Sequence, residues 1–334
     1  MPALFIMILK NYLTNTGFQY TLFWKKGKER DVMKKKTFLG NALLLLTAVI
    51  WGTAFVAQRA GMDSIEPLTF TAARMWPAAL TVGLTALLMR RSSSGHQPVH
   101  TDGKKTALGG ICCGVFLVTA TIFQQMGIVY TTAGKAGFIT AMYMLLVPVA
   151  NFVLFKKRNT WPVWLAVLIG VFGMYLLCIT DGFRLTKGDA LVCVCALLFT
   201  GHILCCDYFV QFCNPVDLSA IQFLTAAVIA TAAAFLAEQP AWEKVVSAAI
   251  PVLYCGIVSG GIGYTLQIVA QKFTDPTVAS LLLSMEAVFA VLAGAVILNE
   301  RMSGRELAGC AVMFAAILMV QFPFPDKKHP VGKV

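Results

Sequence analysis

The chain has 334 residues, of which 58% are hydrophobic and 13% charged, and its mean hydropathy is +0.74. This composition is too apolar for an ordinary soluble domain, so several membrane spans are expected. The net charge of +11 does not indicate nucleic-acid binding, because the basic residues lie in short clusters between apolar runs, as membrane topology would place them.

Residues 1–36 are predicted to form a cytoplasmic N-terminal extension. The apolar piece from Pro2 to Leu9 is too short for a span, and the lysine-rich stretch after it does not indicate a cleaved signal peptide. Met33 is followed by three lysines, which is typical of a start before a first span. Two interpretations of residues 1–32 therefore stay open: native sequence, or an extension from an upstream start.

Ten spans are predicted after this extension, each long enough to cross the roughly 30 Å hydrocarbon core as a helix. The connections are short, apart from a solvated Ser/Gly/Pro-containing loop at residues 90–105. Residues 323–334 are predicted to be a cytoplasmic tail. The ten runs cover about residues 38–61, 67–89, 106–128, 131–155, 161–180, 188–210, 217–238, 247–270, 276–298 and 303–322.

The orientation is predicted from the basic residues. Most of the 27 Lys and Arg residues fall on the side of the membrane that holds the N-terminus. Because positive residues collect on the cytoplasmic side, both termini are expected to be cytoplasmic.

The chain contains an internal repeat. Gly40 falls on Gly188, an offset of 148, and the same offset superposes Pro67 on Pro215 without a gap. Later in the chain the offset is 143, and the matches are Gln124 on Gln267, Thr131 on Thr274, Ala136 on Ala279, Met142 on Met285, Ala150 on Ala293 and Arg158 on Arg301. Two five-span repeats are predicted, at residues 37–180 and 188–322.

Five is an odd number, so the second repeat must enter the membrane from the opposite side. The predicted fold is an all-α polytopic membrane protein with ten transmembrane helices in two inverted five-helix repeats. Transporters of this construction bind substrate near the midplane, between the repeats, and alternate access by rocking one repeat against the other. Chance similarity between apolar helices is the alternative explanation.

Glu286 is the leading candidate for a functional residue. It lies about ten residues, or about 15 Å of helical rise, from either end of the run Thr277 to Glu300. A carboxylate at the centre of a spanning helix costs about 2.5–3.5 kcal/mol and normally faces the bundle interior or a watery cavity. The repeat pairs it with Tyr143 on the fourth span. The alternative is a structural carboxylate bonded to a neighbouring helix.

Arg74 is the second charged candidate. It lies about seven residues, or roughly 10 Å, inside Pro67 on the second span, too deep to reach water easily. Such a cation needs a partner or a polar cavity, and both roles are kept open. The repeat pairs Arg74 with Gln222 on the seventh span.

The other candidates for the translocation pathway are polar or aromatic residues inside spans. Each also has a structural interpretation as a packing or interhelical hydrogen-bonding residue, and His202 as a satisfied core histidine. They are Trp51, Phe55, Gln124, His202, Tyr264 and Gln267.

The ten cysteines are interpreted as small apolar side chains, because nine lie inside apolar runs and Cys213 lies just beyond one. His202, Cys205 and Cys206 have helical spacing that could suit a soft metal, but no second ligand pair follows them. No metal and no cofactor is therefore predicted.

Three stretches give the sequence a resemblance to the EamA family of the drug/metabolite transporter superfamily. They are LLTAVIWGTAFVAQR at 45–59, YTTAGKAGFITAMYMLLVPV at 130–149, and SLLLSMEAVFAVLAGAVILNE at 280–300. The resemblance covers about residues 37–322 and implies ten spans and a carrier that moves small metabolites, in many members outward. Where a proline often follows the glutamate, this chain has Ala287, which puts a kink of the ninth helix in doubt.

The expected function is therefore secondary active transport of small metabolites such as amino acids, amines or related compounds, in the export direction. The cavity is expected between the first, third, fourth, sixth, eighth and ninth spans. Expected partners are the small-molecule substrate, the lipid bilayer and protons exchanged by Glu286, in a monomer or homodimer of the plasma membrane. Nucleic acid is not an expected partner.

Two other classes stay open. An integral-membrane enzyme acting on lipids or head groups would need clustered acidic or histidine residues near one face, and the loop with Asp181, Arg184 and Asp189 is too generic for such a site. A channel would more naturally show a repeated polar stripe or a charged ring. A uniporter would show the same residues as a proton-coupled carrier, so both stay open.

Overall fold

The computed structural model describes residues 26–92, 102–130, 133–156, 159–178, 186–297 and 303–321. Within these ranges every regular element is a helix. In chain order they are α2 (Lys26–Gly61), α3 (Pro67–Ser92), α4 (Gly103–Ile128), α5 (Ala133–Ala141), α6 (Tyr143–Phe155), α7 (Trp161–Cys178), α8 (Lys187–Val210), α9 (Pro215–Ala237), α10 (Trp242–Ser247), α11 (Ala249–Leu253), the π-helix η1 (Tyr254–Tyr264), α12 (Thr265–Gln271), α13 (Pro276–Leu283), α14 (Glu286–Ile297) and α15 (Gly304–Gln321).

Eight helical segments in the described ranges are long and apolar enough to cross a membrane. Two shorter apolar helical stretches, Trp161–Gly173 and Leu307–Ala316, coincide with the predicted fifth and tenth spans. The chain is thus an all-α polytopic membrane protein, and the count of ten spans stays a prediction. The helix of the first predicted span begins earlier than expected, at Lys26 instead of residue 38.

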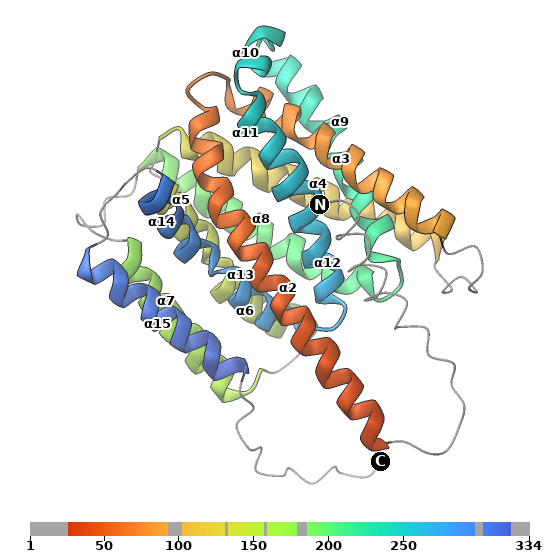
Figure 1. The fold of residues 1–334 in the computed structure, drawn as a ribbon, viewed down its shortest axis with the longest axis vertical. Coiled ribbons are helices and arrows are strands. Elements are labelled where there is room, and N and C mark those ends of the chain that lie inside the picture. The colour runs from red at the N-terminus through yellow and green to blue at the C-terminus, as the bar shows by residue number, and fades with distance from the viewer. Residues whose placement is uncertain are drawn as a thin grey trace.

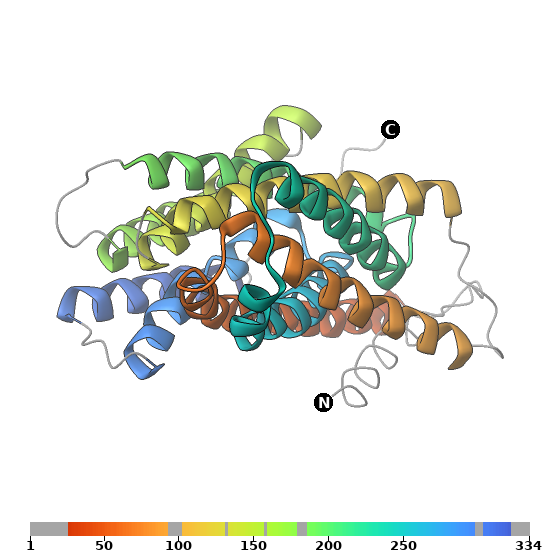
Figure 2. The same cartoon turned by 90° about the horizontal axis from the view of Figure 1, so that it is seen from above.

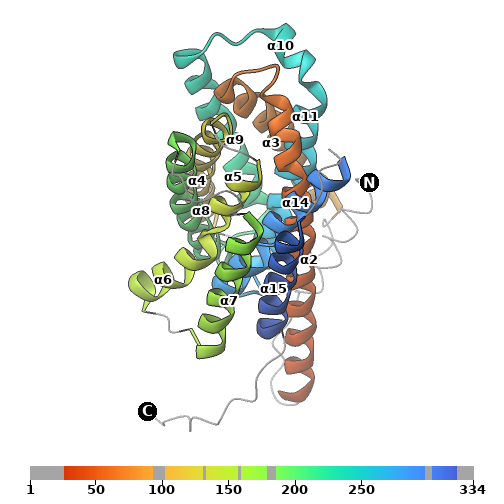
Figure 3. The same ribbon diagram turned by 90° about the vertical axis from the view of Figure 1, so that its left-hand side faces the viewer.

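The helices form one elongated bundle in which partners from distant parts of the sequence lie side by side (Figures 1 to 3). α7 packs along α15 at one edge, and α3 packs along α9 towards the other. α4 contacts both α8 and α9, and α14 lies against α2. Each of these pairs joins a helix before residue 180 to one after residue 186, so the two predicted repeats interleave throughout the bundle.

Polar bonds hold α3 to α9 at both ends and in the middle. Near residue 90, Arg90 and Asp217 form an ion pair of 2.9 Å. At the opposite end, the Glu238 carboxylate accepts the backbone N–H groups of Leu68 and Thr69 at 3.0 and 2.7 Å, so it caps the start of α3. Between them, Trp76 Nε1 donates to Thr231 Oγ1 at 3.0 Å.

The predicted fourth and ninth spans are each broken near the middle. α5 ends at Ala141 and α6 starts at Tyr143, while α13 ends at Leu283 and α14 starts at Glu286. The breaks share a hydrogen-bond pattern: Met142 N–H donates to Ile139 O at 3.2 Å, and Met285 N–H donates to Leu282 O at 3.3 Å. Each of these bonds joins residues three positions apart instead of four, which tightens the helix locally.

The break between α13 and α14 interrupts the ninth span, in which Ala287 put a kink in doubt. It forms without a proline. Ser284 Oγ donates to Leu281 O at 2.7 Å and Ser280 Oγ to Thr277 O at 2.8 Å, so side-chain hydroxyls bond carbonyls of the last α13 turns. In lipid, irregular backbone is tolerated where side chains supply such bonds, and both serines are fully buried.

The predicted eighth span, about 247–270, is also not a single regular helix. It is built from the end of α10, then α11, η1 and α12. A Cβ on Gly256 would lie 2.6 Å from Arg74 O, and one on Gly260 would lie 2.9 Å from Ala78 Cβ. The two glycines therefore let the π-helix approach α3 closely, in keeping with a small-residue interface in a membrane bundle.

Candidate functional site

A cavity lies inside the bundle. Nine of the ten residues singled out from the sequence line it. They are Trp51, Phe55, Arg74, Gln124, Tyr143, His202, Tyr264, Gln267 and Glu286.

The walls come from more helices than expected. The predicted lining from the first, third, fourth, sixth, eighth and ninth spans is present, but α3 adds Arg74, Met75 and Ala78, and α9 adds Phe223. The broken fourth and ninth spans and the π-helix all contribute, so the irregular backbone of the bundle lies around this space. Irregular backbone at membrane depth is normally found where it lines a cavity.

Glu286 and Tyr143 contact each other directly. The Tyr143 hydroxyl donates to Glu286 Oε1 at 2.9 Å, and both side chains are buried. Each is the first residue after the break in its helix. The two residues paired by the sequence offset of 143 therefore meet across the cavity wall, and the phenol satisfies one oxygen of the buried carboxyl group.

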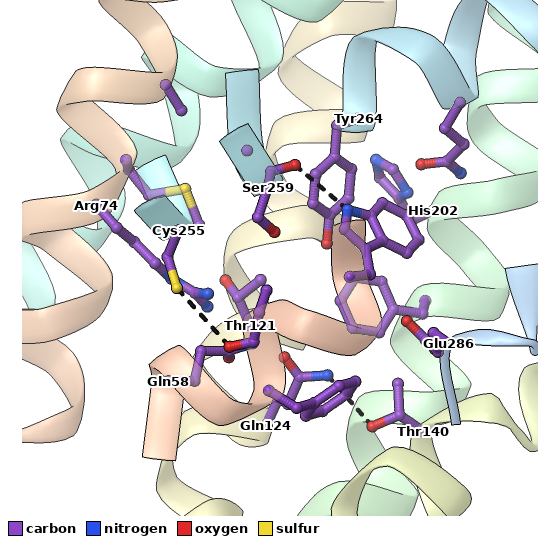
Figure 4. Close-up of a pocket in the computed structure, with 18 of the residues that line it drawn as sticks. Gln58, Arg74, Thr121, Gln124, Thr140, His202, Cys255, Ser259, Tyr264 and Glu286 are labelled. Atoms are coloured by element: carbon purple, nitrogen blue, oxygen red, sulfur yellow. Dashed lines mark hydrogen bonds between the residues drawn. The ribbon is translucent and has the colours of Figure 1, made fainter. Parts of the chain in front are cut away.

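Arg74 enters the cavity from the side opposite Glu286 (Figure 4). Its side chain is only 6% exposed, and its Nε and Nη2 atoms have no hydrogen-bond partner among the described residues. Its Cζ atom lies 5.6 Å from the centre of the Phe70 ring, a weak cation–π contact. No described carboxylate forms an ion pair with Arg74; the ion pairs found are Arg90–Asp217 and Lys244–Glu66.

Aromatic rings make one wall of the cavity. The Trp51 and Tyr264 rings lie 4.5 Å apart, and Trp51 Nε1 donates to Ser259 O at 3.3 Å, which fixes the indole (Figure 4). Tyr264 also makes edge contacts with His202 at 5.8 Å and Phe223 at 5.6 Å. Such a wall suits the flat or apolar part of a small molecule.

Gln222 is the one predicted site residue that does not line the cavity. It lies behind His202, with its Oε1 atom 3.1 Å from His202 Nε2. The same ring nitrogen lies 3.5 Å from Cys206 Sγ, but no group of three or more His, Cys, Asp or Glu residues in the described ranges could hold a metal ion. The Nδ1 atom of His202 has no partner among the described residues.

Gln124 and Gln267 each lie about one turn from the end of a helix, α4 and α12, and both line the cavity. Gln124 Nε2 donates to Thr140 Oγ1 at 3.2 Å (Figure 4). Gln267 Nε2 donates to Gln271 Oε1 at 3.0 Å, and Gln271 Nε2 continues the chain to Ile203 O at 3.1 Å. The Gln267 Oε1 atom has no partner in the described protein.

Several polar lining residues were not among the sequence candidates: Gln58, Thr121, Thr140, Cys255 and Ser259. Four of them are threonine, serine or cysteine, which also occur throughout the lipid-facing parts of such helices. Gln58 did carry a sequence signal, because it lies seven residues after Trp51 and therefore on the same helix face. Its Oε1 atom is buried and has no hydrogen-bond partner among the described residues.

Comparison with known proteins adds the following. The sequence model of the EamA-like transporter family matches the chain twice, at residues 38–179 and 186–322. The two matches together cover nearly all of the helical bundle. A crystal structure of a protein with 20% sequence identity covers 84% of this chain and 96% of its own, with a TM-score of 0.68. At that identity the likeness bears on the fold alone.

Three curated proteins are similar over most of the chain. An uncharacterized transporter of Archaeoglobus fulgidus is 26% identical, covering 93% of this chain and 94% of its own length. The Bacillus subtilis uncharacterized transporter YoaV is 21% identical, covering 88% and 99%. A WAT1-related chloroplastic protein of Arabidopsis thaliana is 24% identical, covering 86% and 70%.

Proposed function

The chain belongs to the EamA-like transporter family and is a multi-pass membrane transporter of small substrates, not an enzyme; from this premise we propose that it is a secondary carrier that works by alternating access. Its substrates are small polar metabolites of the size of amino acids or amines, and the transport direction is export. The bilayer is the plasma membrane, with both termini in the cytoplasm, as the distribution of Lys and Arg favours.

One observation carries the proposal: the Tyr143–Glu286 hydrogen bond between two helices broken in the same way, beside a cavity in the bundle that both aromatic and polar side chains line. The equivalence of the two breaks at an offset of 143 supports two inverted repeats. Broken helices beside a midplane site are a recurring device of inverted-repeat transporters, because they offer unpaired backbone and mobile half-helices to the substrate.

The alternating motion is proposed to differ from simple rocking of one repeat against the other. α3 and α9 belong to different repeats but are bonded at both ends and in the middle. Sliding them apart would break all these bonds in every cycle. We propose that this pair stays together and that α2, α13 and α14 move against α4, α5, α6 and α8 around the cavity.

The test is isotope exchange in proteoliposomes. Vesicles with the purified protein are loaded with a uniformly ¹³C-labelled cell extract and placed in unlabelled extract. A carrier exchanges inner for outer molecules, so we expect a few compounds to lose label faster when the unlabelled compound is outside, with rates that saturate. Empty vesicles are the control. Label loss independent of the outer compound would favour a channel, and no protein-dependent label loss would contradict transport by this site.

Export is tested separately in cells. A metabolite comparison of cells with and without the protein is expected to show the exchanged compounds enriched in the medium of the cells that contain it. Enrichment inside those cells would contradict the proposed direction while leaving the carrier assignment intact.

A further inference from the structure

The cavity holds a buried cation with unused hydrogen-bonding capacity. Arg74 lies about two turns inside the start of α3, is 6% exposed, and has two guanidinium nitrogen atoms without partners among the described residues. A guanidinium presents its donors as a planar fork that matches carboxylate geometry. An unpaired charge in a bilayer costs free energy, so a site that retains one normally uses it.

None of the described residues forms an ion pair with Arg74. Glu286 is the other formally charged residue that lines the cavity, and its Oε1 atom accepts the hydrogen bond of Tyr143. The two side chains project from opposite sides of the space (Figure 4). Arg74 is therefore held away from the carboxylate that would otherwise neutralise it.

We infer that Arg74 binds a carboxylate of the transported molecule and that transported substrates carry a carboxylate. The inference rests on the proposed carrier function and narrows its substrate class: amines without a carboxyl group are excluded. A phosphate is disfavoured because its second negative charge would lie in the same small cavity as Glu286. The unpartnered Oε1 atoms of Gln58 and Gln267 accept hydrogen bonds from donor groups on the rest of the molecule.

The first test uses the compounds that exchange in the ¹³C-extract assay. Each is identified by mass spectrometry and sorted by its ionisable groups. We expect all compounds with protein-dependent exchange to contain a carboxylate. Protein-dependent exchange of a compound with no carboxylate, whether an amine or a phosphate ester, would overturn the inference while the carrier function stands. An absence of any exchange would contradict the proposed function and this inference with it.

The second test uses variants of Arg74. Arg74→Gln removes the charge, and Arg74→Lys keeps the charge but loses the fork. For the exchanging compounds, we expect the concentration giving half-maximal exchange to rise at least tenfold in Arg74→Gln and less in Arg74→Lys, because a charge-assisted bidentate contact is lost or weakened. Arg90→Gln, which breaks the ion pair with Asp217 outside the cavity, is the matched control and should leave that concentration unchanged.

Folding is followed separately by thermal unfolding of each purified variant. The readout that a purely structural role would not move is selectivity. If the inference holds, the amide or ester of an exchanged compound, which lacks the negative charge, competes poorly with wild type and comparatively better with Arg74→Gln. Equal competition by acid and amide in the wild-type protein would overturn it.

Discussion

At the scale of single residues, the carboxyl group of Glu286 and the phenol of Tyr143 occupy equivalent positions in the two predicted repeats and are bonded to each other. Both follow a helix break, both are buried, and one donates a hydrogen bond to the other. The asymmetry of acid and phenol means that any proton transfer at this pair is carried by Glu286. The proposed coupling to protons therefore depends on one side chain.

Glu286→Gln tests this coupling. The amide keeps the size of the side chain but cannot take up and release a proton. We expect exchange of bound compounds to persist at a reduced rate, and the acceleration of net flux by a pH gradient to disappear. The measurement is flux of an exchanged compound in proteoliposomes, with and without a gradient, in both directions.

The matched control is Glu243→Gln, an exposed carboxylate on α10 that lies outside the cavity. It should respond to the gradient like the wild type. If the gradient still drives flux through Glu286→Gln at the wild-type rate in both directions, Glu286 has no part in coupling.

The residue scale also shows what a sequence can predict about such a site. Depth in a span identifies Glu286 and Arg74, because ionisable groups are costly in lipid. The repeat identifies Tyr143, because it pairs that position with Glu286. All three line the cavity. Gln222 is predicted from its repeat equivalence to Arg74, but equivalent positions need not face the same space. Its side chain instead lies within hydrogen-bond distance of His202.

At the scale of elements, small residues set how closely the helices approach. A Cβ on Gly52 would lie 2.8 Å from Glu286 O and 2.8 Å from Ala290 N, so α2 rests directly on the start of α14. Gly52 therefore helps to position the half-helix that carries Glu286.

Gly52→Ala is expected to push α14 away from α2. Inserting a methyl group into such a contact typically costs about 1–3 kcal/mol, so the thermal unfolding temperature of the purified protein should fall by several degrees, and exchange should slow. Gly83→Ala on α3 is the matched control, because nothing lies within 4 Å of the added Cβ. Equal stability of the two variants would show that the contact is not as close as described.

Element geometry was harder to predict than element position. The continuous apolar runs at 131–155, 247–270 and 276–298 each predict one helix, yet all three contain breaks or a π-helix. Hydropathy indicates which segments lie in lipid, but it gives no information about backbone hydrogen bonding. The breaks depend on contacts that the sequence does not show. Examples are the hydrogen bonds of Ser280 and Ser284 and the close approaches of the η1 glycines.

A contact between the loop before α3 and the short helix α10 offers a test of pH dependence. Lys244 Nζ contacts Glu66 Oε1, and this hydrogen bond and the charge of Lys244 lower the pKa of Glu66 below its ordinary value. Because the folded pKa is lowered, the stabilisation is present at neutral pH and is lost as the pH falls through the folded pKa. The side chains are 48% and 38% exposed, so solvent limits it to about 1 kcal/mol or less.

Glu66→Gln should therefore lower the unfolding temperature slightly at pH 7 and not at all well below pH 4, where the wild-type carboxyl group is protonated too. The difference between the two proteins should also shrink in high salt, since exposed charges are screened. A difference that is the same at pH 3 and pH 7 would assign the effect to packing and not to the ion pair.

At the scale of the whole molecule, the two predicted repeats are interleaved. α7 with α15, α3 with α9, and α4 with α8 each join one repeat to the other, so no plane divides the bundle into the two sequence copies. The sequence predicts which segments are equivalent. It does not predict which helices move together, because that depends on the strength of contacts between segments far apart in the chain.

The pairs that stay together and the pairs that separate can be distinguished by cross-linking. Thr69 and Glu238 join α3 to the end of α9, with Thr69 Oγ1 donating to the carboxylate at 2.7 Å. Arg59 and Ile128 join α2 to the end of α4, with Arg59 Nη1 donating to Ile128 O at 3.2 Å. The second contact therefore joins a helix of one proposed moving body, α2, to a helix of the other, α4.

Carriers with cysteine pairs at these two contacts are treated with a short thiol-reactive cross-linker and assayed for ¹³C exchange. We expect the Thr69→Cys/Glu238→Cys pair to retain exchange, because α3 and α9 move as one body. The Arg59→Cys/Ile128→Cys pair should lose it, because α2 must move against α4 for the substrate to leave. Single-cysteine variants treated in the same way control for the native thiols. Loss of exchange in the first pair with retention in the second would reverse the assignment of moving bodies and restore rocking of the two repeats as the simpler mechanism.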